Sequence, residues 1–145
     1  ADYAGSDLLC YLAEHPTHLV AEQIRDWTPW RDWAARELGI RVEATRGIIH
    51  RTQPPESLAR VREHALALDD FALTGLATAV PLLGSAILGL AVQRGALSGV
   101  AAFDLSRLDE AFQERQWGID ADNADRTAAR RAEADLLDRW FRALA

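Results

Sequence analysis

The sequence predicts an all-α fold, an orthogonal bundle of about seven helices around a central apolar helix pair. Three observations predict it. Residues 71–92 contain no charged residue at all. Several other segments repeat apolar residues every three or four positions, as amphipathic helices do. Capping residues and short connectors separate these segments, and short helices of this kind pack at steep crossing angles.

The uncharged stretch has two interpretations. As one helix, residues 71–92 would be about 33 Å long, enough to cross a bilayer. Pro81 has no amide hydrogen, however, and should interrupt the helix near Val80, leaving two segments too short to span. The flanks also lack the Trp/Tyr belt and the one-sided basic cluster of a membrane helix. We predict a buried core, with a membrane-associated helical protein anchored through residues 71–92 as the alternative.

Charge and cysteine content restrict the classes of partner. The net charge of −6 argues against binding the phosphate backbone of a nucleic acid. Every one of the sixteen cationic residues is arginine, and the absence of lysine favours a bacterial source. The single Cys10 rules out an internal disulfide and fits a reducing compartment. The first residues do not form a signal peptide, so we expect an intracellular protein without stable membrane insertion.

Two short helices are expected at the start of the chain. The first covers residues 7–14, with Ser6 as its N-cap and Pro16 as its terminator. The second follows Thr17 as its N-cap. Its apolar face at helical spacing contains Val20, Ile24 and Trp27.

A third helix is expected to begin at Pro29, because Thr28 offers a capping hydroxyl and proline is favoured at the first helical position. Gly39 is its expected C-terminal cap. Three tryptophans recur at every third position across this region: Trp27, Trp30 and Trp33. We interpret them as packing residues, and the alternative is a partly exposed aromatic patch used for binding.

Residues 40–45 alternate apolar and polar side chains, which predicts a short extended segment whose pairing partner the sequence does not show. A loop follows, marked by Gly47 and Pro54, in which Ile48 and Ile49 are expected to point inward.

The next helix is expected to start at Pro55 and to lead into the uncharged stretch. Its apolar stripe consists of Leu58, Val61, Ala65 and Leu68. Glu56 and Arg60 are spaced to form an ion pair on its outer face. Asp69 or Asp70 is positioned to cap the central stretch.

Two further elements complete the predicted bundle. Ser98 caps a helix that continues or kinks into residues 106–118 and ends at Gly118. Asp120 caps the last helix. The inner face expected for this helix contains Ala129, Ala132, Leu136, Trp140 and Leu144. The ion pairs expected on its outer face are Asp122–Arg126, Asp135–Arg139 and Asp138–Arg142.

Reactive groups do not converge in the sequence. Without lysine, an ordinary phosphate-binding P-loop cannot form, and the G-x-S-x-G nucleophile motif is absent. Pro16 separates His15 from His18 and spoils the helical face that two zinc ligands would share. Asp109 and Glu110 could act as acid and base, but no other reactive group is placed beside them. We predict no enzyme, no cofactor and no metal, and keep a small-molecule-binding bundle, with the tryptophan face lining a pocket, as an alternative.

Residues 106–118, SRLDEAFQERQWG, resemble the signature of the ATP synthase F(1) assembly chaperones that bind the alpha subunit, known in mitochondria as assembly factor 2. Similar residues follow the family order elsewhere in the chain: Asp7-Leu-Leu-Cys-Tyr11, Gln23, Trp27, Pro29, Trp33, Gly47-Ile48, Pro54, Leu58, Gly84-Ser85 and Leu88 to Ala91. Two positions depart from the pattern, Leu12 where a basic residue is expected and Ile119 where an acid is common.

This resemblance implies a non-enzymatic chaperone that holds the alpha subunit of ATP synthase until a beta subunit replaces it. It also implies a family fold in which a largely β N-terminal domain precedes an orthogonal helical bundle. Residues 1–145 correspond to the bundle as one helical domain, and the β-rich domain is expected to be absent from the chain. The implied compartment is the bacterial cytoplasm, or the mitochondrial matrix in a eukaryote; the oligomeric state stays open.

The resemblance places an important acidic residue of the family at Asp109 or Glu110. Helical spacing independently turns Leu105, Leu108 and Phe112 toward the core and places Asp109, Gln113 and Gln116 together on another face. The predicted partner-binding residues are Arg107, Asp109, Glu110, Gln113 and Trp117. In the alternative interpretation, the two acids only pair with nearby arginines in a solvated network that contributes little.

Overall fold

A computed structural model describes residues 2–47 and 49–145 of the chain. The fold is mostly helical, as predicted. Its α-helices are α1 (Thr17–Trp33), α2 (Pro55–Leu66), α3 (Asp70–Leu83), α4 (Ala86–Gln93), α5 (Gly99–Ser106), α6 (Leu108–Trp117) and α7 (Ala121–Leu144). The shorter elements are the 3₁₀ turns η1 (Asp2–Ser6) and η2 (Leu8–Cys10), the π-helical turn η3 (Ala34–Leu38), and the strands β1 (Tyr11–Leu12) and β2 (Thr45–Arg46).

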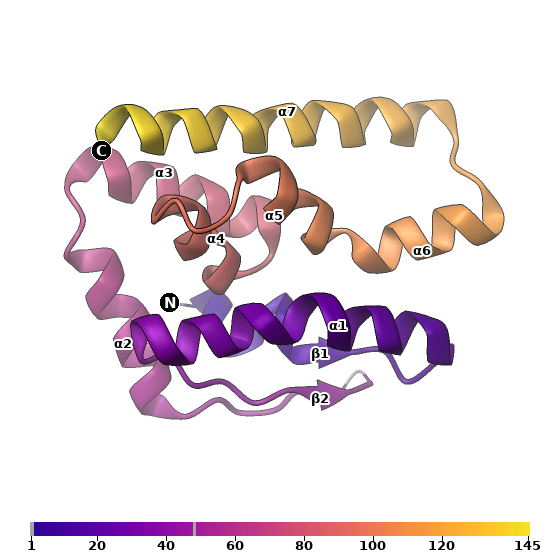
Figure 1. Ribbon diagram of the computed structural model, residues 1–145, viewed down its shortest axis with the longest axis horizontal. Helices are drawn as coiled ribbons and strands as arrows, with labels where there is room; N and C mark the ends of the chain where they lie inside the picture. Colours follow the sequence, from indigo (N-terminus) through magenta and orange to yellow (C-terminus); the bar gives the residue numbers. More distant parts are fainter. Residues whose placement is uncertain (1, 48) are drawn as a thin grey trace.

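The two longest helices lie on opposite sides of the molecule. Figure 1 shows α7 along the whole of one side and α1 along the other, with α4 and α5 between them. Helix α2 stands at one end, and α6 leads to the start of α7 at the other end. Helix α7 packs against both α3 and α5. The core therefore lies around α4, while the end that contains α6 is farther from it.

The uncharged stretch forms the predicted helix pair, but only α4 is buried on all sides. Helix α3 buries one face and leaves Phe71, Ala77 and Pro81 exposed on the other. Helix α3 continues through Pro81 to Leu83, three residues after Val80, where the break was predicted. Gly84 has a φ of 65°, which suits glycine, and the Ser85 hydroxyl accepts a hydrogen bond from the Leu88 amide at 3.0 Å to start α4. Residues 86–92 of α4 are all buried. No helix among the described residues is both long and apolar enough to cross a bilayer.

The first predicted helix is wrong, because Asp7 organises this segment differently. The Asp7 carboxylate accepts hydrogen bonds from the amides of Leu9 at 3.0 Å and Ile87 at 3.1 Å, so it fixes the chain to the start of α4. Burial raises the pKa of Asp7, and these hydrogen bonds act in the opposite direction. The chain then extends into β1, where Tyr11 pairs with Thr45 of β2 in parallel. This is the partner that the extended segment needed.

The predicted division between a second and a third helix is also wrong. Helix α1 runs without interruption through Pro29. Hydrogen bonds on both sides of Pro29 fix α1 to the rest of the molecule. The Trp27 indole donates to the Leu105 carbonyl at 2.9 Å, and Arg31 donates to the Leu9 carbonyl. Gly39, with a φ of 68°, ends the following π-helical turn as predicted. Trp27 is buried and the other two tryptophans are half-buried against the core, which confirms the packing interpretation.

The loop before α2 is more exposed than predicted. Ile49 is 75% exposed, so its predicted inward orientation is wrong, and Ile48 lies outside the described residues. Pro55 starts α2 as predicted. Arg60 pairs with Glu63 at 2.6 Å and not with Glu56, so the predicted partner is wrong.

The predicted inner face of α7 is wrong. The residues that α7 buries are Ala134, Asp138 and Phe141. Leu136, which was expected inside, is 60% exposed. Close approach to α5 sets this orientation, since a Cβ at Gly99 would lie 2.1 Å from the Ala134 carbonyl oxygen. The ion pairs Asp135–Arg139 and Asp138–Arg142 form as predicted, at 3.0 and 3.1 Å.

Candidate functional site

The segment from Arg107 to Trp117 forms α6, whose apolar side is anchored and whose polar side is free. Leu108 and Phe112 are buried, as their spacing predicted. On the side toward α1, Arg115 donates two hydrogen bonds to the Glu22 carboxylate, at 2.9 and 3.1 Å. The Arg115 guanidinium also lies 5.5 Å from the centre of the Phe112 ring. These contacts fix the rotation of α6 about its own axis and leave its remaining face exposed to solvent.

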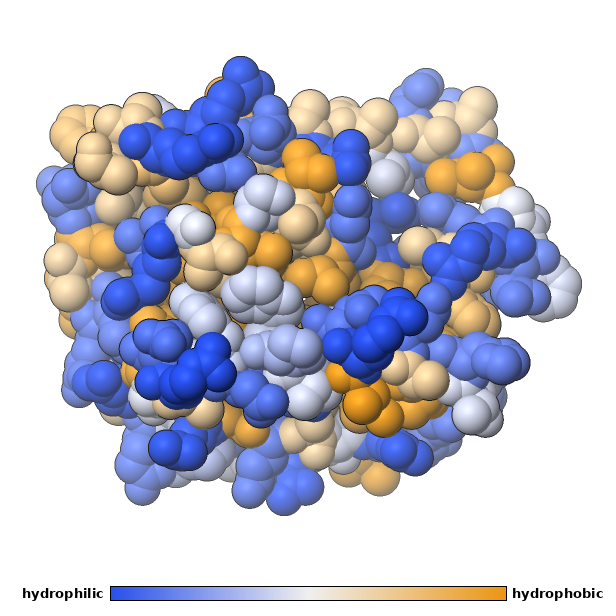
Figure 2. All heavy atoms as spheres, in the orientation of Figure 1, coloured by the Kyte–Doolittle hydropathy of each residue, from blue (hydrophilic) through white to orange (hydrophobic). Residues whose placement is uncertain are grey.

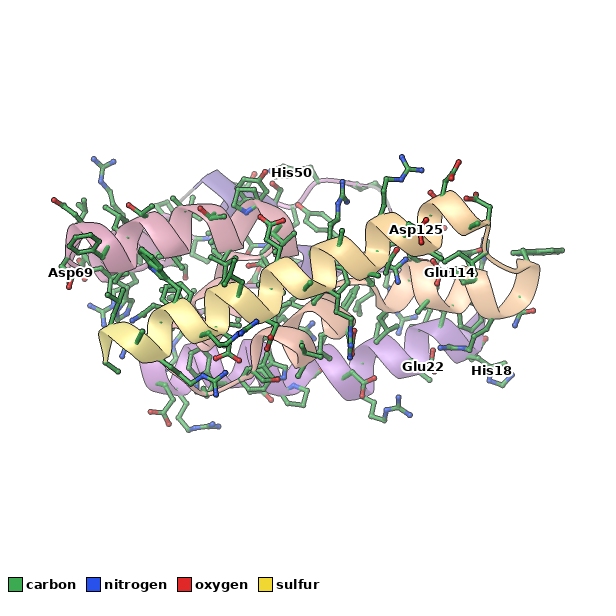
Figure 3. The ribbon with its side chains drawn as sticks, turned by 90° about the horizontal axis from the view of Figure 1, so that it is seen from above. His18, Glu22, His50, Asp69, Glu114 and Asp125 are labelled. Carbon is green, nitrogen blue, oxygen red and sulfur yellow. The ribbon has the colours of Figure 1, made fainter. Side chains whose placement is uncertain are left out.

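A groove of about 650 Å³ separates α6 from the first half of α7. Its floor comes from η2, from the end of α3 with Gly84 after it, and from α5, and consists of Leu8, Pro81, Leu82, Leu83, Gly84 and Phe103. Its α6 wall contains Glu110, Gln113 and Glu114, and its α7 wall contains Asn123, Arg126, Thr127 and Arg130. In Figure 3, Glu114 lies on α6 beside the first turns of α7, at the opposite end of the molecule from Asp69.

The structure divides the five predicted site residues between the groove and the outer surface. Arg107, Glu110 and Gln113 line the groove. Asp109 is exposed outside the groove lining. Trp117, at the last position of α6, is 83% exposed and lies outside the lining too. The sequence grouped Gln113 with Asp109, whereas the groove brings it together with Glu110.

Ion pairing differs along the α6 wall. Arg107 donates to the Glu114 carboxylate at 2.6 Å, with both side chains mostly buried. Asp109 and Glu110, by contrast, form no ion pair within the described residues. The alternative in which these two acids only pair with nearby arginines therefore lacks the contacts it requires.

The α7 wall was missed by sequence reasoning. Arg126 and Arg130 lie one helical turn apart and both reach the groove. The sequence placed Arg126 in a pair with Asp122, but its guanidinium donates to the Asn123 side-chain oxygen at 2.6 Å. The sequence does contain two arginines at four-residue spacing, which places both on one face of a helix. They were not recognised as site residues because the inner face of α7 was assigned to the wrong residues.

Features of a catalytic or metal site do not assemble around the groove. Its lining includes carboxylates but no histidine. Across residues 2–47 and 49–145, no three His, Cys, Asp or Glu side chains are grouped so that they could hold a metal ion. On the face shown in Figure 2, apolar residues reach the surface in patches separated by hydrophilic ones.

Solved structures are similar to this chain over nearly all of its length, although no family model matches the sequence. The crystal structure of Atp12 from Paracoccus denitrificans is 42% identical, with a TM-score of 0.94 over 97% of this chain. The chain is homologous to Atp12. An aspartate-to-lysine variant of the Paracoccus protein matches with the same TM-score of 0.94.

Two further relatives extend the comparison. Atu1473 of Agrobacterium tumefaciens, described as a candidate chaperone, is 38% identical with a TM-score of 0.86 over 99% of this chain. The mitochondrial protein atp12 of Schizosaccharomyces pombe is 26% identical over 108 residues, which are 72% of this chain. The chain spans 60% of the Paracoccus Atp12 chain and 37% of the yeast protein. The part of each bacterial structure that matches this chain is therefore mostly helical.

Proposed function

We propose that this chain is a chaperone module for assembly of the ATP synthase catalytic head, and that it binds the unassembled alpha subunit. The observation that carries the proposal is the likeness to the Paracoccus Atp12 structure, with a TM-score of 0.94 at 42% identity. The resemblance of residues 106–118 to the chaperone signature adds to it, because those residues form an exposed helix. The module acts without catalysis and without a cofactor.

The polar face of α6 is the proposed contact surface for the alpha subunit. It comprises Arg107, Asp109, Glu110, Gln113 and Trp117. An exposed tryptophan is typical of protein interfaces, where a large aromatic side chain supplies buried area. The carboxylates on the same helix can add specificity.

In the proposed mechanism, the module temporarily covers a surface of the alpha subunit. The module occupies, on the free alpha subunit, an area that is later buried against a beta subunit. A chaperone of this type must be displaced, so a partly polar interface of modest size suits it better than an extensive apolar one. We further propose that residues 1–145 form one domain, an orthogonal bundle, that acts in the bacterial cytoplasm, or in the mitochondrial matrix if the source is eukaryotic.

Capture of purified alpha subunit by the immobilised chain tests this proposal. We expect Asp109→Lys/Glu110→Lys to reduce capture roughly tenfold or more, since charge reversal places like charges against the partner. The two single variants then show which acid matters. Asp32→Lys/Glu56→Lys is the matched control, because it reverses two exposed acids on α1 and α2.

The fold of each variant is checked by circular dichroism. If the wild-type chain fails to capture the alpha subunit, the proposed function is wrong. If the folded Asp109→Lys/Glu110→Lys variant binds as well as the control, these two acids do not belong to the interface.

A further inference from the structure

The groove between α6 and α7 has an arginine wall on the α7 side and a mixed wall on the α6 side, where Arg107 lies beside the two glutamates. On the α7 side, Arg126 and Arg130 reach it from successive turns. On the α6 side, Glu110 and Glu114 face it. The floor between the walls is apolar, formed mainly by leucines, Pro81 and Phe103. A ligand that fits this groove must offer apolar groups in the middle and a negative charge toward α7.

The two walls do not neutralise each other. Glu114 is already paired with Arg107 at 2.6 Å. Arg126 bonds only the neutral amide oxygen of Asn123, and Arg130 forms no ion pair within the described part of the chain. The α7 wall therefore presents two guanidinium groups without a carboxylate partner. The planar fork of arginine matches a carboxylate in two parallel hydrogen bonds.

The charge pattern and the apolar floor favour a protein segment over a small polyanion. A volume of about 650 Å³ is enough for several side chains. A phosphorylated small molecule would meet the α7 arginines, but its phosphate oxygens offer no hydrogen-bond donor to the Glu110 carboxylate on the facing wall. The apolar floor would also find no counterpart on such a ligand. A peptide satisfies all three surfaces at once, because apolar and acidic side chains alternate along its backbone and its amides can donate to Glu110.

We propose that the α6–α7 groove holds a segment of the partner in which apolar residues flank one or two carboxylates. The apolar side chains lie on the accessible part of the floor, at Leu8, Pro81 and Leu82, and the carboxylates bind Arg126 and Arg130. The inference rests on the proposed function, in that the segment belongs to the alpha subunit of ATP synthase. It assigns to the groove a recognition role separate from the outer surface around Asp109 and Trp117.

Charge reversal on the α7 wall tests the proposal with purified alpha subunit as the probe. We expect Arg126→Glu/Arg130→Glu to weaken binding roughly tenfold or more, and to flatten the salt dependence of the remaining binding. The matched control is Arg46→Glu/Arg62→Glu, which makes the same charge change at exposed positions outside the groove. If the glutamate variant fails to fold, Arg126→Gln/Arg130→Gln removes the charges with a smaller perturbation.

The outcomes separate the two proposals. If the wild-type chain does not bind the alpha subunit, the proposed function and the groove's partner are both overturned. If the wild type binds and the folded groove variant binds as tightly as the control, the groove proposal alone is overturned. A photo-crosslinking residue at Thr127, which lines the groove, identifies the bound segment by mass spectrometry. Crosslinking to an acidic, apolar segment supports the proposal, and crosslinking to a segment without a carboxylate overturns it.

Discussion

The two halves of α7 have different surroundings although they belong to one uninterrupted helix. The second half buries Ala134, Asp138 and Phe141 against α3 and α5. The first half contributes no buried residue, and its Arg126 and Arg130 face the groove. Close packing in one half holds the helix in place, and the other half is thereby free to present charged side chains. Changes in the second half should therefore affect stability, and changes near the groove should affect binding.

Gly99→Ala should have the largest effect on stability. A Cβ at this position would lie 2.1 Å from the carbonyl oxygen of Ala134, so α5 and α7 must move apart. We expect the free energy of unfolding to fall by about 3 kcal/mol or more, at the upper end of overpacking costs. Urea unfolding measures it. Gly5→Ala is the control, since nothing lies within 4 Å of a Cβ there, and an equal loss in both variants would contradict close packing as the cause.

Asp138→Ala should have the next largest effect. This carboxylate is only 6% exposed and accepts a hydrogen bond from the Gly99 amide at 2.8 Å, at the start of α5. Removing it leaves a buried N–H without a partner, which costs about 1–3 kcal/mol. The comparison is Asp135→Ala, whose ion pair with Arg139 is exposed and should contribute less than about 1 kcal/mol. Thermal unfolding of both variants checks the difference, and equal losses would assign no special role to the buried carboxylate.

Local signals in the sequence were the most informative about the fold. Asp69, Ser98 and Asp120 cap their helices as predicted, because each cap is a hydrogen bond to an amide only three residues away. The parallel pairing of Tyr11 with Thr45 could not be predicted, since it depends on how distant segments pack. The prediction of the buried face of α7 was wrong for the same reason, because Gly99, which lies outside this helix, determines which face is buried.

The candidate site was likewise predictable from the sequence only in part. Helical spacing placed Leu108 and Phe112 in the core and left the polar face of α6 outside, as the structure has it. The α7 wall was not predicted, because the groove exists only once α6 and α7 are folded beside each other. Arg126 and Arg130 resemble any surface arginines until Glu110 is seen across from them.

Trp117→Ala should have the smallest effect on stability and a clear effect on binding. The side chain is 83% exposed at the end of α6, so its removal should change the free energy of unfolding by less than about 0.5 kcal/mol. If α6 contacts the alpha subunit, the loss of an exposed aromatic anchor should weaken capture roughly tenfold. Trp140→Ala is the control, because this tryptophan is also partly exposed but donates to the Phe71 carbonyl at the other end of α7. Weakened capture by Trp140→Ala with normal capture by Trp117→Ala would move the interface away from α6 and toward the closely packed half of α7.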